Sequence, residues 1–257
     1  MATLIDTHAH ITDPKLDAQE IIYNMDADGL SHLVLASYSY QNSIDNLLLA
    51  KADKRLFCTL GIHPSYVNEF ADSHLEVFLG HSSDEKVIAI GEVGLDYHYE
   101  GFDAKLQQYA FVAQLELAHV ANLPIVIHMR DADQDVQKIL RQNKSKLTHG
   151  GVMHCYSGSL ESAHTYMDLG FYISFSGSIT FKNAKKYPEI IANLPLDKIL
   201  TETDCPYLAP QEFRGQLNYP KYVRCVAQKI AEIKGISFDQ VATATTKNAL
   251  SIFKKMK

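Results

Sequence analysis

The amino-acid sequence predicts an α/β protein that folds as a single (β/α)8 TIM-type barrel over residues 1–257. Three observations favour this fold. Short apolar runs alternate with amphipathic stretches along the whole chain, eight such runs are present, and the length of 257 residues is typical of one α/β barrel. No linker rich in proline, glycine or serine divides the chain, so we expect one domain.

The predicted strands are short segments rich in aliphatic residues. In chain order they span residues 3–6, 32–37, 56–61, 87–91, 124–128, 151–154, 171–174 and 199–202. Helical periodicity lies between them, most clearly at 103–121, and two further helices are expected at about 219–234 and 237–250. A doubly wound open sheet is the competing architecture. The segment Asp-Thr-His-Ala-His after the first strand does not resemble the glycine-rich nucleotide loop of such sheets.

Composition and charge narrow the class of protein. No apolar run approaches the ~20 residues that cross a bilayer, so we expect no membrane association. The N-terminus lacks the basic segment of a secretory signal, and the four cysteines (Cys58, Cys155, Cys205 and Cys225) form no CxxC pair. Both features favour a cytoplasmic location. A net charge of −6 argues against a broad basic surface, and no obligate protein partner is evident.

Side chains that can bind metal ions stand at the predicted strand ends. His8 and His10 alternate with Thr7 and Ala9 after the first strand, so both imidazoles share one face. Further donors end four other strands: Glu92, His128, His154 and Asp204. Barrel active sites are assembled at this rim. Six nitrogen and oxygen donors from five strands predict two divalent ions of the Mg, Mn or Zn class, ~4 Å apart and bridged by a carboxylate.

The motifs around these residues resemble those of the TatD family of metal-dependent hydrolases, in the amidohydrolase superfamily. The resemblance runs in order from residue 6 to about 220, over Asp6-Thr7-His8-Ala9-His10, Gly61-Ile62-His63-Pro64, Gly91-Glu92-Val93-Gly94-Leu95-Asp96-Tyr97, His128-Met129-Arg130-Asp131-Ala132, His154-Cys155-Tyr156-Ser157-Gly158 and Glu202-Thr203-Asp204-Cys205-Pro206-Tyr207-Leu208. It implies that one metal ion would be held by His8, His10, Glu92 and Asp204. The other would be held by Glu92, His128 and His154, with Glu92 as the bridge. The family is described as nucleases that remove nucleotides from DNA, and some members are linked to other hydrolytic reactions.

Carboxylates near the ligands have alternative roles. Asp204 could accept the proton of the attacking water or act as a ligand only. Glu202 shares the face of Asp204 and could hold the hydrogen-bond network of the site. Asp6 could orient a ligand histidine through its second ring nitrogen, or make a hydrogen bond in the barrel floor. Asp96 and Tyr97 are expected to shape the pocket, with a purely structural role favoured.

Substrate contacts are expected from His63, Arg130 and Arg214. Arg130 could clamp a phosphate group, or pair with a carboxylate, either Asp131 or Glu202. His63 resembles an active-site position of the family and could steady the leaving-group oxygen or cap a loop. Tyr99 and Phe102 could stack on a base, although aromatic residues are more often packed in the core.

The loop that carries Arg214 departs from the family pattern. Members commonly carry Arg-Gly-Lys and end the stretch with Asn-Glu-Pro, whereas this chain reads Arg-Gly-Gln-Leu-Asn-Tyr-Pro over 214–220. The loss of a lysine there weakens the expectation of tight polynucleotide binding.

The leading interpretation is a deoxyribonuclease that hydrolyses phosphodiester bonds from DNA ends with a metal-activated water. The alternative is a C–N or ester hydrolase acting on a small amide, a lactone or an aminoacyl ester. Many superfamily members bridge their ions with a carboxylated lysine, but Lys86 lies at the wrong end of the fourth strand, which favours Glu92. A third interpretation, a barrel that only binds a partner, is disfavoured because all six donors are present.

Overall fold

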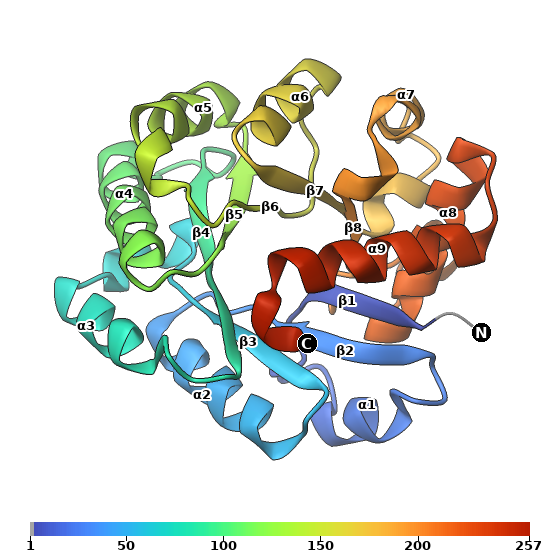
Figure 1. Ribbon diagram of the computed structural model, residues 1–257, viewed down its shortest axis with the longest axis horizontal. Coiled ribbons are helices and arrows are strands. Elements are labelled where there is room, and N and C mark those ends of the chain that lie inside the picture. Colours follow the sequence, from blue (N-terminus) through green and yellow to red (C-terminus); the bar gives the residue numbers. More distant parts are fainter. Residues whose placement is uncertain (1–2) are drawn as a thin grey trace.

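The computed structural model describes residues 3–257, and its eight strands form one parallel sheet surrounded by helices (Figure 1). Each strand pairs with the next one along the chain. The strands are β1 (Leu4–Ala9), β2 (Leu30–Leu35), β3 (Leu56–Leu60), β4 (Val87–Asp96), β5 (Ile125–Arg130), β6 (Gly151–Met153), β7 (Phe171–Phe175) and β8 (Ile199–Thr201). This arrangement confirms the predicted (β/α)8 fold.

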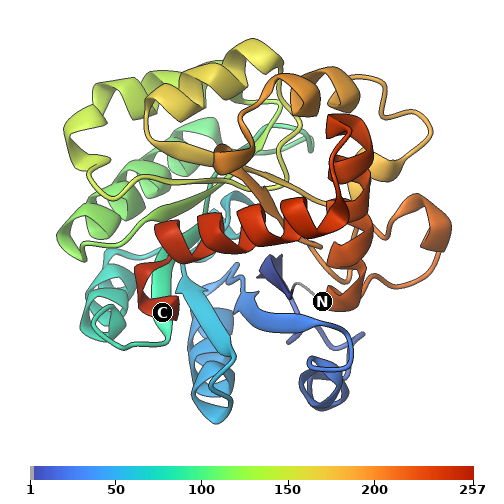
Figure 2. The same ribbon diagram turned by 45° about the vertical axis from the view of Figure 1, so that its right-hand side comes forward.

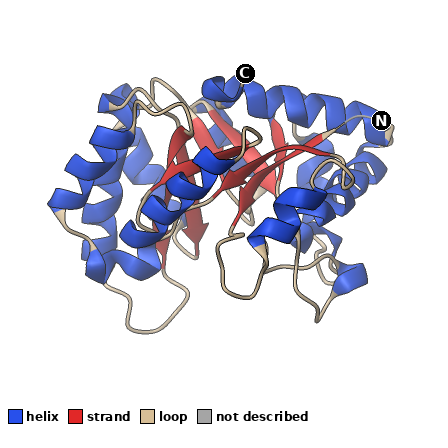
Figure 3. Ribbon diagram, turned by 90° about the horizontal axis from the view of Figure 1, so that it is seen from below, coloured by secondary structure: helices blue, strands red, loops and turns tan. Residues whose placement is uncertain are grey.

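Helices follow the strands and enclose them, as Figure 3 shows. They are α1 (Ala18–Asn24), α2 (Tyr40–Ala52), α3 (Asp72–His81), α4 (Ala104–Val120), α5 (Asp133–Gln142), α6 (Leu160–Asp168), α7 (Tyr187–Asn193), α8 (Val223–Lys234) and α9 (Phe238–Ile252). Local signals set their starts: Asp103 caps α4 by accepting two backbone N–H groups, and Ser237 forms a capping box with Gln240 at α9. Within residues 3–257, no helix is long and apolar enough to cross a bilayer.

Apolar side chains fill the N-terminal end of the barrel and leave the other end open. Inward residues of the strands pack with the end of α9 and the turn after it, which lie across the barrel in Figure 2. This cluster contains Ile5, Val34, Ile88, Val126, Val152 and Leu200 from the strands, with Ala249, Ile252, Phe253 and Met256. The polar residues of the strands are therefore gathered at the C-terminal mouth.

Most strand bounds differ from the predicted ones by one or two residues, but two strands continue at least three residues beyond their predicted ends. β4 continues to Asp96 instead of ending at residue 91, so Glu92 lies inside the strand, where the β4–β5 register shifts between Ile90 and Val93. β1 continues to Ala9 and includes His8. We expected polar residues to mark the ends of the strands. In β1 and β4 the backbone pairing between strands continues past His8 and Glu92, because these polar side chains are buried in a polar site.

The junction between β1 and β8 is made by individual hydrogen bonds. The carbonyl of His8 accepts the N–H of Asp204 (2.9 Å), and His10 N–H donates to the carbonyl of Cys205 (2.8 Å). Asp6, which is fully buried, accepts the backbone N–H of Thr203 (2.9 Å), its hydroxyl, and the backbone N–H of His8 (3.2 Å). Asp6 therefore takes the barrel-floor role, and its carboxylate does not orient a ligand imidazole.

Candidate metal centre

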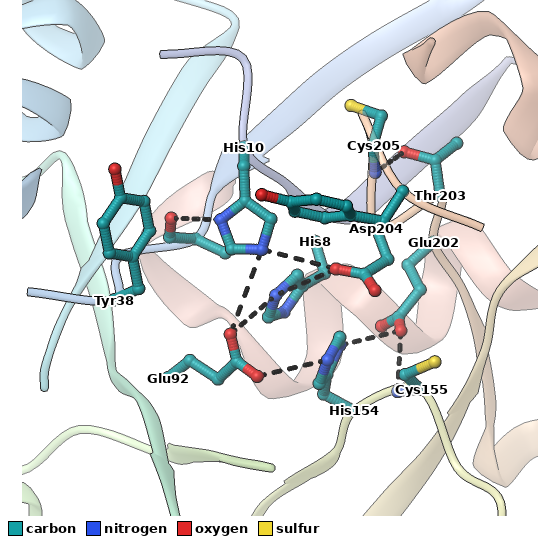
Figure 4. Close-up of polar contacts among 12 residues, drawn as sticks. His8, His10, Tyr38, Glu92, His154, Cys155, Glu202, Thr203, Asp204 and Cys205 are labelled. Carbon is teal, nitrogen blue, oxygen red and sulfur yellow. Dashed lines mark hydrogen bonds and ion pairs between the residues drawn. The ribbon is translucent and has the colours of Figure 1, made fainter. Parts of the chain in front are cut away.

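The carboxylate of Glu92 contacts imidazoles from several strands, and Figure 4 shows its contacts with His8, His10 and His154. Its Oε2 atom is 3.3 Å from His8 Nε2 and 3.9 Å from His10 Nε2. Its Oε1 atom is 2.9 Å from His128 Nδ1 and 3.3 Å from His154 Nε2. Each carboxylate oxygen thus faces a different pair of the predicted donor histidines, which is the arrangement that a bridging ligand requires.

Asp204 completes the cluster on the side of His8 and His10. Its Oδ1 atom is 3.3 Å from His10 Nε2 and 3.9 Å from His8 Nε2. The residue follows β8 in a left-handed conformation (φ 58°), which aspartate tolerates better than most side chains. The hydrogen bond from its N–H to His8 holds this turn, so the barrel junction itself positions the carboxylate.

The donor set fits a metal ion. His8 is 1% exposed, and neither of its ring nitrogens has a hydrogen-bond partner among the described residues. Burial lowers the pKa of His8, which keeps the ring neutral with a free lone pair, the form that binds metals. Ligand atoms of His8, His10 and Glu92 lie within 4.8 Å of one another. A metal ion bound among them would give the buried His8 ring a partner, whereas a buried polar group without a partner destabilises the fold.

Second partners hold the ligand rings in place. Nδ1 of His10 donates to the carbonyl of Ala36 (3.1 Å), which leaves Nε2 directed at the carboxylates. Nε2 of His128 donates to Asp96 Oδ2 (3.0 Å). Carboxylates and carbonyls in this position fix the orientation of metal-binding histidines. Asp96 therefore has a more specific role than the pocket-shaping role expected from the sequence, because it holds the His128 ring. The sequence signal for this role is its spacing of four residues from Glu92, which places both side chains on one face of β4.

Glu202 supports His154 from behind. Its Oε1 atom lies 2.8 Å from His154 Nδ1 and accepts the backbone N–H of Cys155 (2.7 Å), while Oε2 accepts the Ser174 hydroxyl (2.6 Å). Burial opposes protonation of His154, but the carboxylates of Glu202 and Glu92 outweigh it and raise the pKa of this imidazole to about 10. A metal ion that binds His154 would therefore displace the proton that this imidazole holds in the absence of metal.

Glu92 is ionised despite its burial. Desolvation alone would raise its pKa, but the surrounding imidazoles, led by His154 and His63, hold the pKa of Glu92 well below its ordinary value. Lys86, the candidate for a carboxylated bridge, donates instead to the carbonyls of Asp53 (2.9 Å) and Leu56 (3.1 Å) at the start of β4. Of the two candidates for a bridge, Glu92 is therefore the one whose side chain faces the imidazoles of the cluster.

His63 presents a donor to the site. Its Nδ1 atom accepts the N–H of Ser65 (3.0 Å), which caps the short helical turn Pro64–Glu69. Burial lowers the pKa of His63 to about 3, so the ring is neutral and its proton resides on Nε2, 3.5 Å from Glu92 Oε1. Although His63, Glu92 and His128 are close enough to share an ion, this tautomer offers an N–H rather than a lone pair.

The cluster lies in a cavity of about 720 Å³. Its wall includes Arg130 and Tyr99, whose hydroxyl accepts a hydrogen bond from the guanidinium (3.3 Å). Arg130 has no carboxylate partner within the described chain, because Asp131 pairs with His98 (2.7 Å) and Glu202 is bound as above. The guanidinium is therefore free to receive an anion.

Two other expected substrate contacts lie outside the lining of this cavity. Arg214 is exposed, and its guanidinium packs 4.2 Å from the ring centroid of Phe181. Phe102 stacks on Tyr97 (4.6 Å between centroids), and the Tyr97 hydroxyl donates to Asp135. Of the aromatic residues considered for base stacking, Tyr99 lines the cavity and Phe102 packs against its neighbour.

Similarity to known proteins extends over nearly the whole chain. The profile of the family described as TatD related DNase matches residues 5–254. The chain is 39% identical to YabD of Bacillus subtilis, an uncharacterized metal-dependent hydrolase, over 98% of this chain and 99% of that protein. The structure of the TatD homologue YjjV from Escherichia coli aligns with a TM-score of 0.93 and 30% identity, covering 98% of each chain. The chain therefore belongs to the TatD family of metal-dependent hydrolases.

Proposed function

We propose that this protein is a metal-dependent deoxyribonuclease that hydrolyses phosphodiester bonds at DNA ends. The observation that carries the proposal is the position of Glu92, whose two oxygens face separate imidazole pairs at the wall of a cavity large enough for a nucleotide. The family match supports hydrolysis in general, and the cavity residues support a phosphate-containing substrate.

In this proposal the donors form two sets that share Glu92. The first set is His8, His10, Glu92 and Asp204, and the second is Glu92, His128 and His154. When bound, two divalent ions would supply the polarisation of a phosphoryl oxygen and the activation of a water molecule. Asp204 is suited to accept the proton of that water. Burial works against its ionisation, but the hydrogen bond from His10 and the nearby imidazoles keep the pKa of Asp204 below its ordinary value.

Two other residues would hold the substrate. Arg130 would bind a non-bridging phosphate oxygen through its unpaired guanidinium. His63 would donate its Nε2 proton in a hydrogen bond to the leaving oxygen, since Ser65 fixes the tautomer that this requires. The first donor set lies deep in the barrel, with His8 1% and His10 7% exposed. Such depth favours a chain terminus over an intact duplex.

The test compares linear and circular single-stranded DNA, incubated with metal-loaded protein. We expect shortening of the linear strand only, and its loss on addition of a chelator. Asp204→Asn should lower turnover by ~10²–10⁴-fold even where metal content is retained. Asp13→Asn is the matched control, because Asp13 lines the same cavity outside the donor sets, and turnover should change little.

A different result would favour the second candidate activity. If no DNA end is cleaved with Mg, Mn or Zn while an aminoacyl ester, lactone or small amide is hydrolysed, the nuclease proposal is wrong. The same activated water would then attack a carbonyl group, and the function would be that of a C–N or ester hydrolase.

A further inference from the structure

Two loops at the barrel mouth are joined into one surface beside the cavity. The backbone N–H of Gln211, in the loop after β8, donates to the Thr180 hydroxyl in the loop between β7 and α7 (2.8 Å). In the other direction, Lys182 N–H donates to the Gln211 side chain (3.1 Å). The guanidinium of Arg214 packs on the Phe181 ring, which fixes the two loops at a third point.

This surface carries a cluster of exposed, positively charged side chains. Its exposed cations, which we call the basic rim, are Lys182, Lys185, Lys186 and Arg214. Among residues 3–257, no carboxylate lies within ion-pair distance of a member of the basic rim, whereas Lys51, Arg55 and Lys146 show that other cations of the chain are paired; what sets the basic rim apart is that its four cations share two joined loops. In a protein with net charge −6, these four cations concentrate positive charge on two joined loops.

The basic rim is continuous with the cavity wall. Ser178 and Tyr187, near the two ends of the β7–α7 loop, both line the cavity. The amine of Lys186 donates to the carbonyl of Ser157, which lines the cavity as well. Among the described residues of that wall, Arg130 is the one that carries a permanent positive charge, and the adjoining β7–α7 loop adds the lysines of the basic rim.

We propose that the basic rim binds the phosphate groups of a single-stranded polynucleotide where it leaves the cavity. The inference rests on the proposed nuclease function and adds how the chain beyond the terminal nucleotide is held. Lysine amines bind phosphates as flexible point charges without reading base sequence. The three lysines on the β7–α7 loop also compensate for the lysine that the 214–220 loop lacks, which the sequence of that loop alone does not reveal.

The experiment measures equilibrium binding of fluorescein-labelled single-stranded DNA by anisotropy, with metal-loaded protein carrying Asp204→Asn to prevent turnover. Two further double variants are made in this background. Lys182→Gln/Lys185→Gln removes two charges from the basic rim. Lys247→Gln/Lys254→Gln removes two exposed lysines from α9 and the turn after it, at the opposite end of the barrel, and is the control with the same net charge.

The expected effect depends on oligonucleotide length. Each phosphate contact with a single strand changes the salt slope by about 0.7, so the basic-rim variant should lose about 1.4 from the slope and about 25-fold in affinity at ~0.1 M salt. This loss applies to a strand of about twelve nucleotides, whereas a strand of about three should bind both double variants almost equally. The control variant should bind both strands like the parent.

Three outcomes would overturn the inference: equal losses in the two double variants, equal losses for the two strand lengths, or no binding of the longer strand. The third outcome includes rim-dependent binding of phosphatidylserine vesicles without binding of DNA. Turnover of the protein with intact Asp204 separates the two proposals. Cleavage without dependence on the basic rim rejects this inference alone, and rim-dependent binding without cleavage rejects the nuclease function alone.

Discussion

Replacement of Glu92 by alanine should remove more metal than loss of any other donor. Without Glu92, the first set keeps His8, His10 and Asp204, and the second keeps two imidazoles. Without His154, the first set keeps all four donors and only the second is reduced. Stable sites in proteins use three or four protein ligands, so His154→Ala should empty the second set and retain about one ion per chain in the intact first set. Glu92→Ala should also empty the second set, and because it leaves the first set with only three donors it should bind the remaining ion more weakly and retain less metal than His154→Ala, compared with about two ions in the parent.

Elemental analysis after dialysis against metal-depleted buffer measures these contents, and circular dichroism confirms that each variant is folded. Glu92→Gln is the control for side-chain volume, because it keeps one carbonyl oxygen as a donor and should retain an intermediate amount. Two ions per chain in Glu92→Ala would refute the bridging role, since the remaining donors of the second set could then hold an ion unaided.

Other consequences of the structure can be tested separately. Asp96→Asn weakens the partner of His128 and should lower metal affinity by ~10–100-fold in calorimetric titration, and an unchanged affinity would contradict its orienting role. Gly94→Ala places a Cβ atom 2.0 Å from the His128 carbonyl at φ +140°, so it should destabilise the fold in urea far more than Gly29→Ala, which has a positive φ but open space. Asp6→Ala leaves two buried backbone N–H groups without an acceptor and should lower the free energy of unfolding by ~2–6 kcal/mol. Because burial raises the pKa of Asp6 to about 8, the ionised form is disfavoured in the fold, and Asp6→Asn should gain stability relative to the parent as the pH rises from about 4 to about 8. If urea denaturation shows the same difference in the free energy of unfolding between Asp6→Asn and the parent at every pH, ionisation of Asp6 is not the cause.

The sequence predicted the barrel because each strand was a short apolar run bounded by polar residues. The same rule located His128 and His154 near the ends of β5 and β6. It failed inside β4, where Glu92 is followed by four more strand residues. Alternation of side chains along a strand predicts the site better in β4, because residues an even number of positions apart share a face and this rule places Asp96 on the face of Glu92.

Contacts between distant loops were beyond what the sequence could predict. Arg214 drew attention because it lies in a motif, whereas Lys182 and Lys185 lie in a stretch without one. Their shared surface depends on hydrogen bonds between segments about thirty residues apart, such as that of Gln211 with Thr180. No periodicity or spacing encodes such a contact, because it depends on how the loops leave the barrel.

The junction between β1 and β8 also sets the order in which the site can form during synthesis. Asp6 and Thr203 are 197 residues apart, and the same junction brings His8 to Asp204. The imidazoles of β1 must therefore wait for nearly the whole chain to leave the ribosome, whereas β4, β5 and β6 supply their donors from adjacent strands much earlier. A nascent chain that stops before residue 204 can complete only one of the two donor sets.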